Sequence, residues 1–237
     1  MIESARFPPD ADGVVVSDGR TTALDKVVAS VDEAVADIGD DVTVMVGGFG
    51  GSGFPFALRD ALVRRRPKRI TIVCNNADLG GFVYENGLVR IIASYPTGAT
   101  SQPVVEAIED GRVELKLTPQ GTLVERIRAG GSGLGGILTP TGLGTQFESG
   151  YERVEMDGKP YLLVPPLRAD FALVRASLAD RFGNLVHRRA GRNFNPLMAM
   201  AARVTIAEVG QIVEPGEIDP DLVHTPAAFV DRVVQVD

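Results

Sequence analysis

Short runs of hydrophobic residues, each bounded by turn-forming residues, recur along the chain and predict buried strands. The first run covers residues 42–46 and lies between Gly39-Asp40-Asp41 and a glycine-rich stretch. Runs of this length without polar alternation are typical of parallel strands that are covered on both faces. The same pattern predicts further strands at 69–74, 89–94, 113–117, 171–176 and 204–208.

Segments with hydrophobic residues at helical spacing separate these runs. Between residues 23 and 38, valine and isoleucine recur near that spacing, and Thr22 is a candidate N-cap. Strands that alternate with helices imply an α/β fold, with an open, mostly parallel sheet and helices on both faces. The other predicted helices cover residues 57–62, 104–109, 123–129 and 194–202.

Two segments depart from this alternation. Residues 151–164 (YERVEMDGKPYLLV) contain the turn pair Asp157-Gly158 between two strand-like runs, which predicts a small β-hairpin. Residues 1–22 predict a poorly structured lead-in, so we expect the folded domain to span residues 23–237.

The composition is that of an ordinary globular protein. The 237 residues are 44% hydrophobic and 23% charged, which is enough to bury a sizeable core. The net charge of −7 argues against a general affinity for nucleic acid or for an anionic membrane. No hydrophobic run approaches the roughly 20 residues that a membrane span needs, and the acidic N-terminus is unlike a signal peptide. We therefore expect a cytoplasmic protein.

The sequence gives little support for metal or disulfide chemistry. Its single cysteine, Cys74, excludes an intrachain disulfide. His187 and His224 lack the helical spacing of metal ligands, so we expect structural roles for both and no metal site. A basic cluster could meet an anion, or could instead form a solvated face or a contact with another polypeptide: Arg188, Arg189 and Arg192.

A glycine-rich turn, residues 47–55 (GGFGGSGFP), joins the first predicted strand to the next helix. Glycine lets the backbone approach a ligand closely, and the helix that follows offers free N–H groups to an anion. The turn lacks the Lys-Ser/Thr ending of a phosphate-binding loop and fits the dinucleotide-binding spacing poorly. A nucleotide or carboxylate loop and simple tight packing are therefore equally open from these residues alone.

Amide side chains follow two of the predicted strands. Cys74-Asn75-Asn76 closes one strand, and Pro119-Gln120-Gly121 follows another. In open α/β sheets, ligands bind at the carboxyl edge, where we expect these residues to lie. Amides at that edge can hydrogen-bond a carboxylate or a developing oxyanion without adding charge, although Asn and Gln are also common in turns.

Together these segments resemble a known family. Residues 40–55 (DDVTVMVGGFGGSGFP) are similar to the signature of the alpha (type A) subunit of family I CoA-transferases, which include succinyl-CoA:3-oxoacid and 3-oxoadipate CoA-transferases. The resemblance covers about residues 23–234, in order and at similar spacing. It continues at 74–77 (CNNA), 117–136 (LTPQGTLVERIRAGGSGLGG), 139–145 (TPTGLGT), 168–176 (RADFALVRA) and 183–202 (GNLVHRRAGRNFNPLMAMAA).

The resemblance implies a two-subunit enzyme, a CoA-transferase that moves coenzyme A between small carboxylic acids. A glutamate of the beta (type B) subunit would attack the acyl-CoA thioester and pass through an acyl anhydride to a glutamyl-CoA thioester, from which the second acid takes the CoA. The CoA thioester is then a substrate, and we expect no cofactor. The expected partner is this beta subunit, in an αβ or α₂β₂ hetero-oligomer.

The same resemblance assigns to this chain the pocket for the acid. Asn75 matches an asparagine whose amide helps to stabilise the oxyanion, and Gln120 matches a glutamine that contacts the substrate carboxyl group. A second glycine-rich stretch covers residues 130–144. Residues of the glycine-rich turn and of the end of this second stretch, together with Thr145, would line the cleft that faces the partner: Gly47, Gly48, Phe49, Gly50, Gly51, Gly53, Gly142, Gly144 and Thr145.

One motif imitates the catalytic site of the partner. Glu85-Asn86-Gly87 resembles the tripeptide that carries the nucleophilic glutamate in the beta subunit. Here it precedes a predicted strand, at a place where alpha subunits of the family have a turn, and Asn-Gly is a common turn pair. We therefore interpret it as a turn without a catalytic role.

The sequence leaves the acid undecided. Succinyl-CoA is the expected donor, and both acetoacetate and 3-oxoadipate fit as acceptors. The segment between Asn75 and Ser94 is shorter than the family pattern, which makes the choice of acid at this pocket uncertain. Two other interpretations stay open: a hydrolase or C–C-cleaving enzyme that acts on CoA esters, and a non-catalytic sensor of small acids.

Overall fold

The structure is a computed structural model, in which residues 25–76, 79–95 and 102–236 are described. The predicted lead-in, residues 1–22, lies outside these ranges. Within them, eight strands form the main sheet, in which β11, β10, β8, β1, β2, β3 and β4 lie side by side in that order and β9 pairs with β8. The bounds of these strands are β1 Thr43–Val46, β2 Ile70–Cys74, β3 Leu88–Ala93, β4 Glu114–Leu117, β8 Ala169–Asp180, β9 Leu185–Val186, β10 Ala202–Val213 and β11 Arg232–Gln235.

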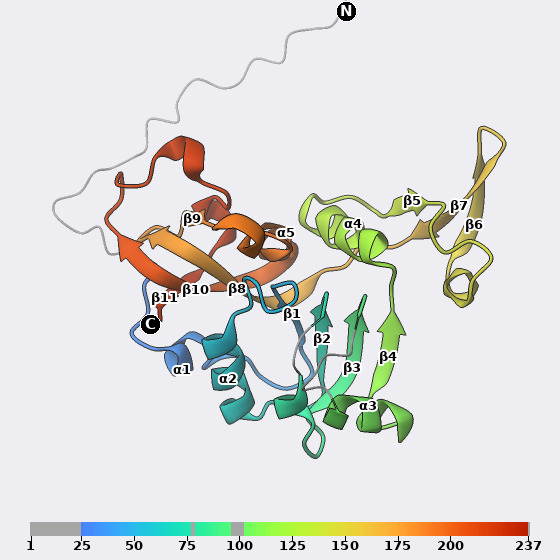
Figure 1. Ribbon diagram of the computed structural model, residues 1–237, viewed down its shortest axis with the longest axis horizontal. Helices are drawn as coiled ribbons and strands as arrows, with labels where there is room; N and C mark the ends of the chain where they lie inside the picture. Colours follow the sequence, from blue (N-terminus) through green and yellow to red (C-terminus); the bar gives the residue numbers. More distant parts are fainter. Residues whose placement is uncertain (1–24, 77–78, 96–101, 237) are drawn as a thin grey trace, which may run out of the picture.

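All neighbours along this path are parallel, and only the short β9 runs antiparallel to its neighbour. Helices cover both faces of the sheet (Figure 1). One face is packed by α1 (Val31–Ala34), α2 (Phe56–Arg65) and α3 (Gln102–Glu109), and the other by α4 (Gln120–Gly131) and α5 (Asn195–Ala201). The predicted α/β architecture is confirmed.

The strand register sets the position of the site. Val46 pairs with both Leu173 and Cys74, Cys74 pairs with Ala93, and Ala93 pairs with Leu117. Strands β1 to β4 therefore end level with one another. Strand order also turns back between β1 and β8, which is where ligands bind in open α/β sheets.

The predicted helix over residues 23–38 is wrong for most of its length. Only Val31–Ala34 is helical, with Ser30 as its N-cap, whereas Thr22 lies outside the described residues. Val27 instead forms a parallel bridge with Val233 beside β11. The valines that suggested one helix therefore belong to two elements, the bridge at Val27 and the helix α1. Residues 26–28 extend the sheet at its β11 edge.

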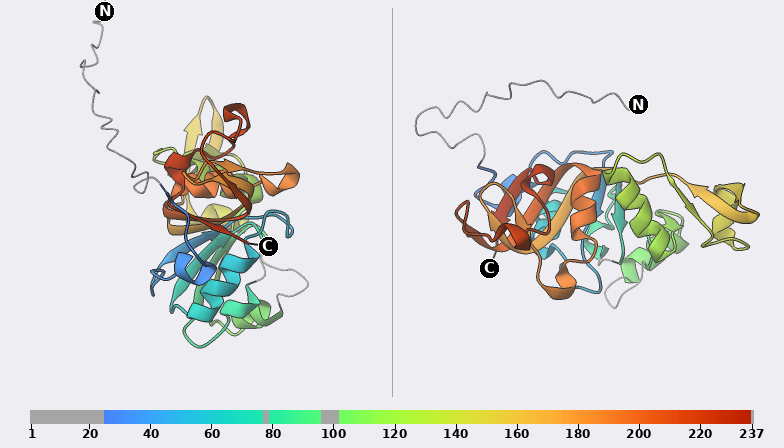
Figure 2. Two further views of the ribbon diagram at one scale, coloured as in Figure 1. Left: turned by 90° about the vertical axis from the view of Figure 1, so that its left-hand side faces the viewer. Right: turned by 90° about the horizontal axis from the view of Figure 1, so that it is seen from above.

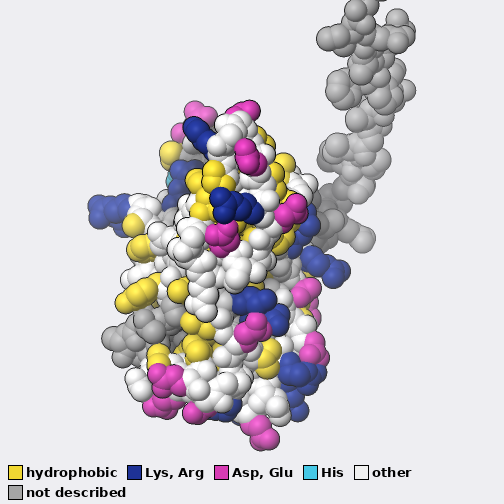
Figure 3. Space-filling model, turned by 90° about the vertical axis from the view of Figure 1, so that its right-hand side faces the viewer, with side chains coloured by type: hydrophobic (Ala, Val, Ile, Leu, Met, Phe, Trp, Pro, Cys, Tyr) yellow, Lys and Arg dark blue, Asp and Glu magenta, His cyan; other side chains and the backbone are white. Residues whose placement is uncertain are grey.

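A three-stranded antiparallel sheet projects from one end of the molecule, beyond α4 (Figures 1 and 2). It consists of β5 (Ile137–Thr139), β6 (Glu152–Met156) and β7 (Lys159–Val164). The predicted hairpin forms β6 and β7, whereas β5 was not predicted because its three residues lie in a glycine-rich stretch. Leu162 and Val164 are buried, and the other face exposes Leu138, Leu163 and Met156. Figure 3 shows this end of the molecule, where hydrophobic side chains are interspersed with charged ones.

Several further elements connect the strands and helices. β9 and β11 were also not predicted, and β8 and β10 run further than expected because they pair with each other along almost their whole length. Short 3₁₀ helices complete the described ranges: Gly80–Phe82, Gln146–Gly150, Arg189–Gly191, Pro220–Leu222 and Ala227–Phe229. No helix in the described residues is long and apolar enough to cross a membrane.

Candidate active site

Four polar residues that follow the strand ends form a hydrogen-bonded group, which we call the amide network: Asn75, Asn76, Ser94 and Gln120. Asn75 follows β2 and Ser94 follows β3, and Gln120 comes after β4, at the first position of α4. The level strand ends bring these residues to the carboxyl edge of the sheet, as the sequence predicts. The sequence placed Gln120 in a turn before a helix that starts at residue 123, and the helix begins at Gln120 itself.

Asn75 lies at the centre of the network, and only 2% of its surface is exposed. Its side-chain oxygen accepts hydrogen bonds from the Ser94 hydroxyl at 2.6 Å and from the Gln120 amide at 2.7 Å. Its side-chain nitrogen donates to Asn76 Oδ1 at 2.6 Å. Because two donors occupy the oxygen, the orientation of the amide is fixed and its N–H₂ group is presented as a donor.

The network also holds the first glycine-rich turn. Asn76 Oδ1 accepts the backbone N–H of Gly50 at 3.0 Å, so the turn and the strand end of β2 are directly connected. Phe49 and Ser52 exchange two backbone hydrogen bonds, which close the turn on itself. Gly51 is exposed, and the side chain of Phe49 is also directed to solvent.

A buried asparagine, which the sequence analysis missed, supports the other side of this turn. Asn195 on α5 is 0% exposed; its amide nitrogen donates to the carbonyl oxygens of Gly53 and Gly191, and its oxygen accepts the backbone N–H of Arg175. A Cβ atom on Gly47 would lie 1.9 Å from Asn195 Oδ1. Close packing therefore requires glycine at position 47. In the sequence, the one sign of this buried amide is a polar residue between Phe194 and Pro196.

A buried ion pair fixes the helix that follows the turn. Glu208 of β10 is 0% exposed, and it accepts the N–H of Leu58 at 2.9 Å and the Arg175 guanidinium at 2.6 Å. Burial raises the pKa of Glu208, and the helix N–H groups and Arg175 oppose that shift. A carboxylate from a distant strand thus satisfies the amino end of α2, which otherwise has free N–H groups.

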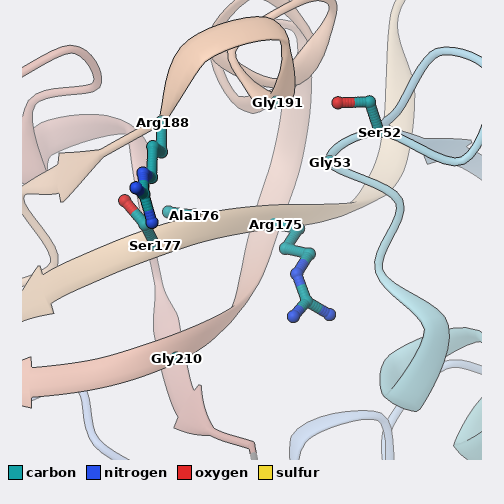
Figure 4. A pocket seen from close by; sticks show the side chains of 8 residues that line it. All are labelled: Ser52, Gly53, Arg175, Ala176, Ser177, Arg188, Gly191 and Gly210. Carbon is teal, nitrogen blue, oxygen red and sulfur yellow. The ribbon is translucent and has the colours of Figure 1, made fainter.

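A pocket of about 320 Å³ adjoins the turn at Ser52 and Gly53. In Figure 4 the Arg188 side chain extends toward Ser177, the Ser52 hydroxyl faces them from the turn, and the Arg175 guanidinium turns away from Arg188. Of the predicted basic cluster, Arg188 thus lines a pocket whose polar lining suits an anion.

A second pocket, of about 500 Å³, lies at the ends of β3 and β4. Thr145 lines it, so one residue of the second glycine-rich stretch does reach the edge of the sheet. Gly142 packs against Phe147, and the Gly144 N–H is held by Glu148 at 2.6 Å, so these two glycines shape the loop that carries Thr145. The residues that line the pocket are Ser94, Leu115, Leu117, Thr118, Pro119, Thr145, Gln146 and Phe147.

The other side chains that the sequence offered for chemistry are either distant from the amide network or buried. Glu85 is exposed in a turn that precedes β3, so it lies at the amino edge of the parallel sheet, opposite to the amide network. Cys74 is buried, and burial raises the pKa of its thiol to about 12. His187 is buried between the Arg175 carbonyl oxygen and the Thr225 hydroxyl. Among the described residues, no group of His, Cys, Asp and Glu could hold a metal ion.

The sequence matches proteins of one family along nearly its whole length. The family model for coenzyme A transferase matches residues 28–236. The type A subunit of 3-oxoadipate CoA-transferase from Acinetobacter baylyi is 47% identical over 90% of this chain and 96% of its own length. The type A subunit of succinyl-CoA:3-ketoacid coenzyme A transferase from Helicobacter pylori is 40% identical over 89% of this chain and 92% of its own length.

Solved structures agree with the fold. An acyl-CoA transferase from Escherichia coli O157:H7 superposes with a TM-score of 0.81 at 22% identity, over 92% of this chain and 48% of that longer chain. At 22% identity the structural similarity shows the fold alone. The family is shown by the family model and by the relatives of higher identity. The chain therefore belongs to the coenzyme A transferase family and is a type A, or alpha, subunit of a CoA-transferase.

Proposed function

We propose that this chain forms the acid-binding half of a transferase that moves CoA from succinyl-CoA to a 3-oxo acid. The amide network carries the proposal, because it gathers Asn75, Gln120 and the glycine-rich turn at the carboxyl edge of the sheet. The network consists of three amides and a hydroxyl and contains no carboxylate. The nucleophilic glutamate would come from a beta subunit, in an αβ or α₂β₂ assembly.

The names of the relatives support the substrate class and the partner. The A. baylyi relative is named for 3-oxoadipate and the H. pylori relative for succinyl-CoA and a 3-ketoacid, and both are named as type A subunits. An alpha subunit implies a second polypeptide that completes the enzyme.

The proposed chemistry begins when the partner's glutamate attacks the thioester carbonyl. CoA leaves as a thiolate, and an acyl-glutamyl anhydride remains. The thiolate then attacks the glutamyl carbonyl, which releases the first acid as a carboxylate and leaves a glutamyl-CoA thioester. The second acid takes the CoA by the same steps in reverse, and no water or oxidant is consumed.

Each step places negative charge on a carbonyl oxygen. Ser94 and Gln120 orient the Asn75 N–H₂ group, whose one hydrogen is donated to Asn76 Oδ1 and whose other hydrogen is proposed to donate to that oxygen. Gln120 is exposed beside Asn75, and while one hydrogen of its amide stays on Asn75 Oδ1, the other can be donated to a substrate carboxylate. These roles match the two assignments made from the sequence.

The test is reconstitution with the cognate beta subunit. We expect no transfer of CoA by either polypeptide on its own and full activity when the two are mixed. After incubation with succinyl-CoA alone, intact-mass spectrometry should find CoA bound as a thioester only on the beta subunit, with none on this chain. Turnover by this chain in a preparation free of the partner, or CoA attached to this chain, would refute the division of roles.

The same experiment separates the hydrolase and C–C-cleaving alternative. If the pair releases free CoA from succinyl-CoA without forming a new thioester, the proposed transfer is wrong.

A further inference from the structure

A leucine at the carboxyl edge of the sheet is unusually exposed to solvent. Leu117, the last residue of β4, is 58% exposed, although it lines the pocket at the ends of β3 and β4. We call this the tail pocket, and its lining residues are those given above. Its hydrophobic surface comes from Leu115, Leu117, Pro119 and Phe147.

The strand alternation explains why the tail pocket is uncharged. Leu115 and Leu117 lie on one side of β4, and Glu114 and Lys116 lie on the other. Glu114 is paired with Arg90 on β3 and lies near Lys116, so the charges of this edge are gathered away from the pocket. Leucines rather than charged residues therefore face the ligand space.

The tail pocket adjoins the amide network and shares Ser94 with it. Ser94 lines the pocket and also donates its hydroxyl to Asn75 Oδ1 at 2.6 Å. Thr118 and Pro119 line it too, and the next residue is Gln120. An acid whose carboxyl group is held by Gln120 can therefore extend its other end toward the tail pocket.

None of the described residues that line the tail pocket is ionisable. Its remaining lining groups are hydroxyls and an amide, from Ser94, Thr118, Thr145 and Gln146. The nearest charge along the 3₁₀ helix Gln146–Gly150 is Glu148, which is itself acidic and is held by the Gly144 N–H and Arg153.

From this lining we infer that the acid is a 3-oxo monocarboxylic acid with an uncharged tail, of the acetoacetate type. The inference rests on the proposed function and narrows its substrate class. A second carboxylate, as in 3-oxoadipate, would enter a hydrophobic pocket of this chain without a cation to pair with it. Burying an unpaired charge is costly, whereas a methyl or short alkyl tail gains from covering Leu117 and Phe147.

The experiment compares both acids on the reconstituted pair, with succinyl-CoA as donor. We expect kcat/KM for acetoacetate to exceed that for 3-oxoadipate by at least about tenfold. Leu117→Arg places a cation at the exposed rim of the tail pocket, so it should lower this ratio by about tenfold or more, mainly through a lower KM for 3-oxoadipate. Lys116→Ala, on the other side of the same strand, is the matched control and should leave the ratio unchanged.

Thr145→Lys provides a second cation from the opposite wall, in case Leu117→Arg fails to assemble with the partner. A native preference for 3-oxoadipate would overturn the inference while leaving the transferase proposal intact. A ratio that neither variant alters would also overturn it, because the tail pocket would then not contact the acid. Absence of transfer to every acid in the panel would refute the proposed function itself.

Discussion

The Gln120 side-chain amide donates a hydrogen bond of 2.7 Å to Asn75 Oδ1, so the two amides assigned to substrate binding and to oxyanion stabilisation are in direct contact. Together with the Ser94 hydroxyl, Gln120 fixes the orientation of the Asn75 side chain. A substitution of either residue should therefore alter the position or orientation of the other side chain.

This contact predicts that substitutions of the two amides are not additive. Asn75→Ala removes an oxyanion donor and should lower kcat by about 100- to 1,000-fold, or roughly 2.7–4 kcal/mol. Gln120→Ala should raise KM for the acid and also lower kcat, because Asn75 loses one of the bonds that orient it. The double variant should differ from the sum of the single effects by about 0.5–3 kcal/mol.

Steady-state kinetics of the four enzymes in this cycle provides the test. Gln102→Ala, which removes an exposed glutamine on α3, is the control and should behave as the native pair does. Strict additivity would show that Gln120 and Asn75 work independently.

Glu85 lies in an exposed turn at the amino edge of the sheet, and its tripeptide resembles the motif that carries the nucleophile in the beta subunit. The backbone of this turn is tied to β2, because Ile70 and Arg69 donate to the carbonyl oxygens of Gly87 and Asn86. Glu85→Gln should therefore keep kcat/KM within a few-fold of the native value. A loss of several orders of magnitude would place the nucleophile on this chain.

Asn195→Asp tests the support of the glycine-rich turn with almost no change in shape. The carboxylate keeps an acceptor for the Arg175 N–H but loses the donations of the amide nitrogen, which include those to Gly53 and to Gly191. These bonds are partly buried, and a buried acceptor left unsatisfied costs about 1–3 kcal/mol, so the midpoint of urea unfolding should fall. We also expect lower kcat/KM, since Gly53 belongs to the turn that Gly50 links to the amide network.

A matched control is Asn193→Asp, which keeps the acceptor for the Phe194 N–H and loses the less buried donations to the carbonyl oxygens of Ser52 and Ala190. Its loss of stability should be smaller. Equal effects would mean that burial at Asn195 is not what makes its bonds important.

The lowered pKa of His187 leads us to expect a loss of folding stability in mild acid. Burial, aided by the charge of His224 and Arg192, lowers the pKa of His187 from 6.5 to about 4 in the folded chain. As the pH falls from about 6.5 to 4, the unfolded chain binds a proton that the folded chain does not, so folding is disfavoured. The free energy of unfolding should decline by roughly 3 kcal/mol over this range from this group.

Urea unfolding at a series of pH values measures this decline. His187→Gln removes the titrating group, so its pH profile should be flatter below pH 6.5 even if its stability at neutral pH is lower. An unchanged slope would show that other groups cause the acid sensitivity.

Strands β1 to β4, the two glycine-rich stretches and the family can all be inferred from the amino-acid sequence without a structure. Hydrophobic runs between turn residues encode a covered strand locally, and glycine and amide residues after such runs are visible without any tertiary contact. The turn interpretation of Glu85 followed from the same local chemistry. Local periodicity failed for residues 23–38, because valines that bridge to β11 and valines that pack as a helical turn have similar spacing.

Which of these residues come into contact depends on how the whole chain folds. Gln120 and Asn75 are 45 positions apart, and their contact depends on the order and register of β2, β3 and β4. The same register places Leu117 and Ser94 on the lining of one pocket, and the pairing of β8 with β1 brings Asn195 to the glycine-rich turn. Strand order arises from the packing of the whole chain, so contacts between segments distant in sequence leave no periodic signal to read.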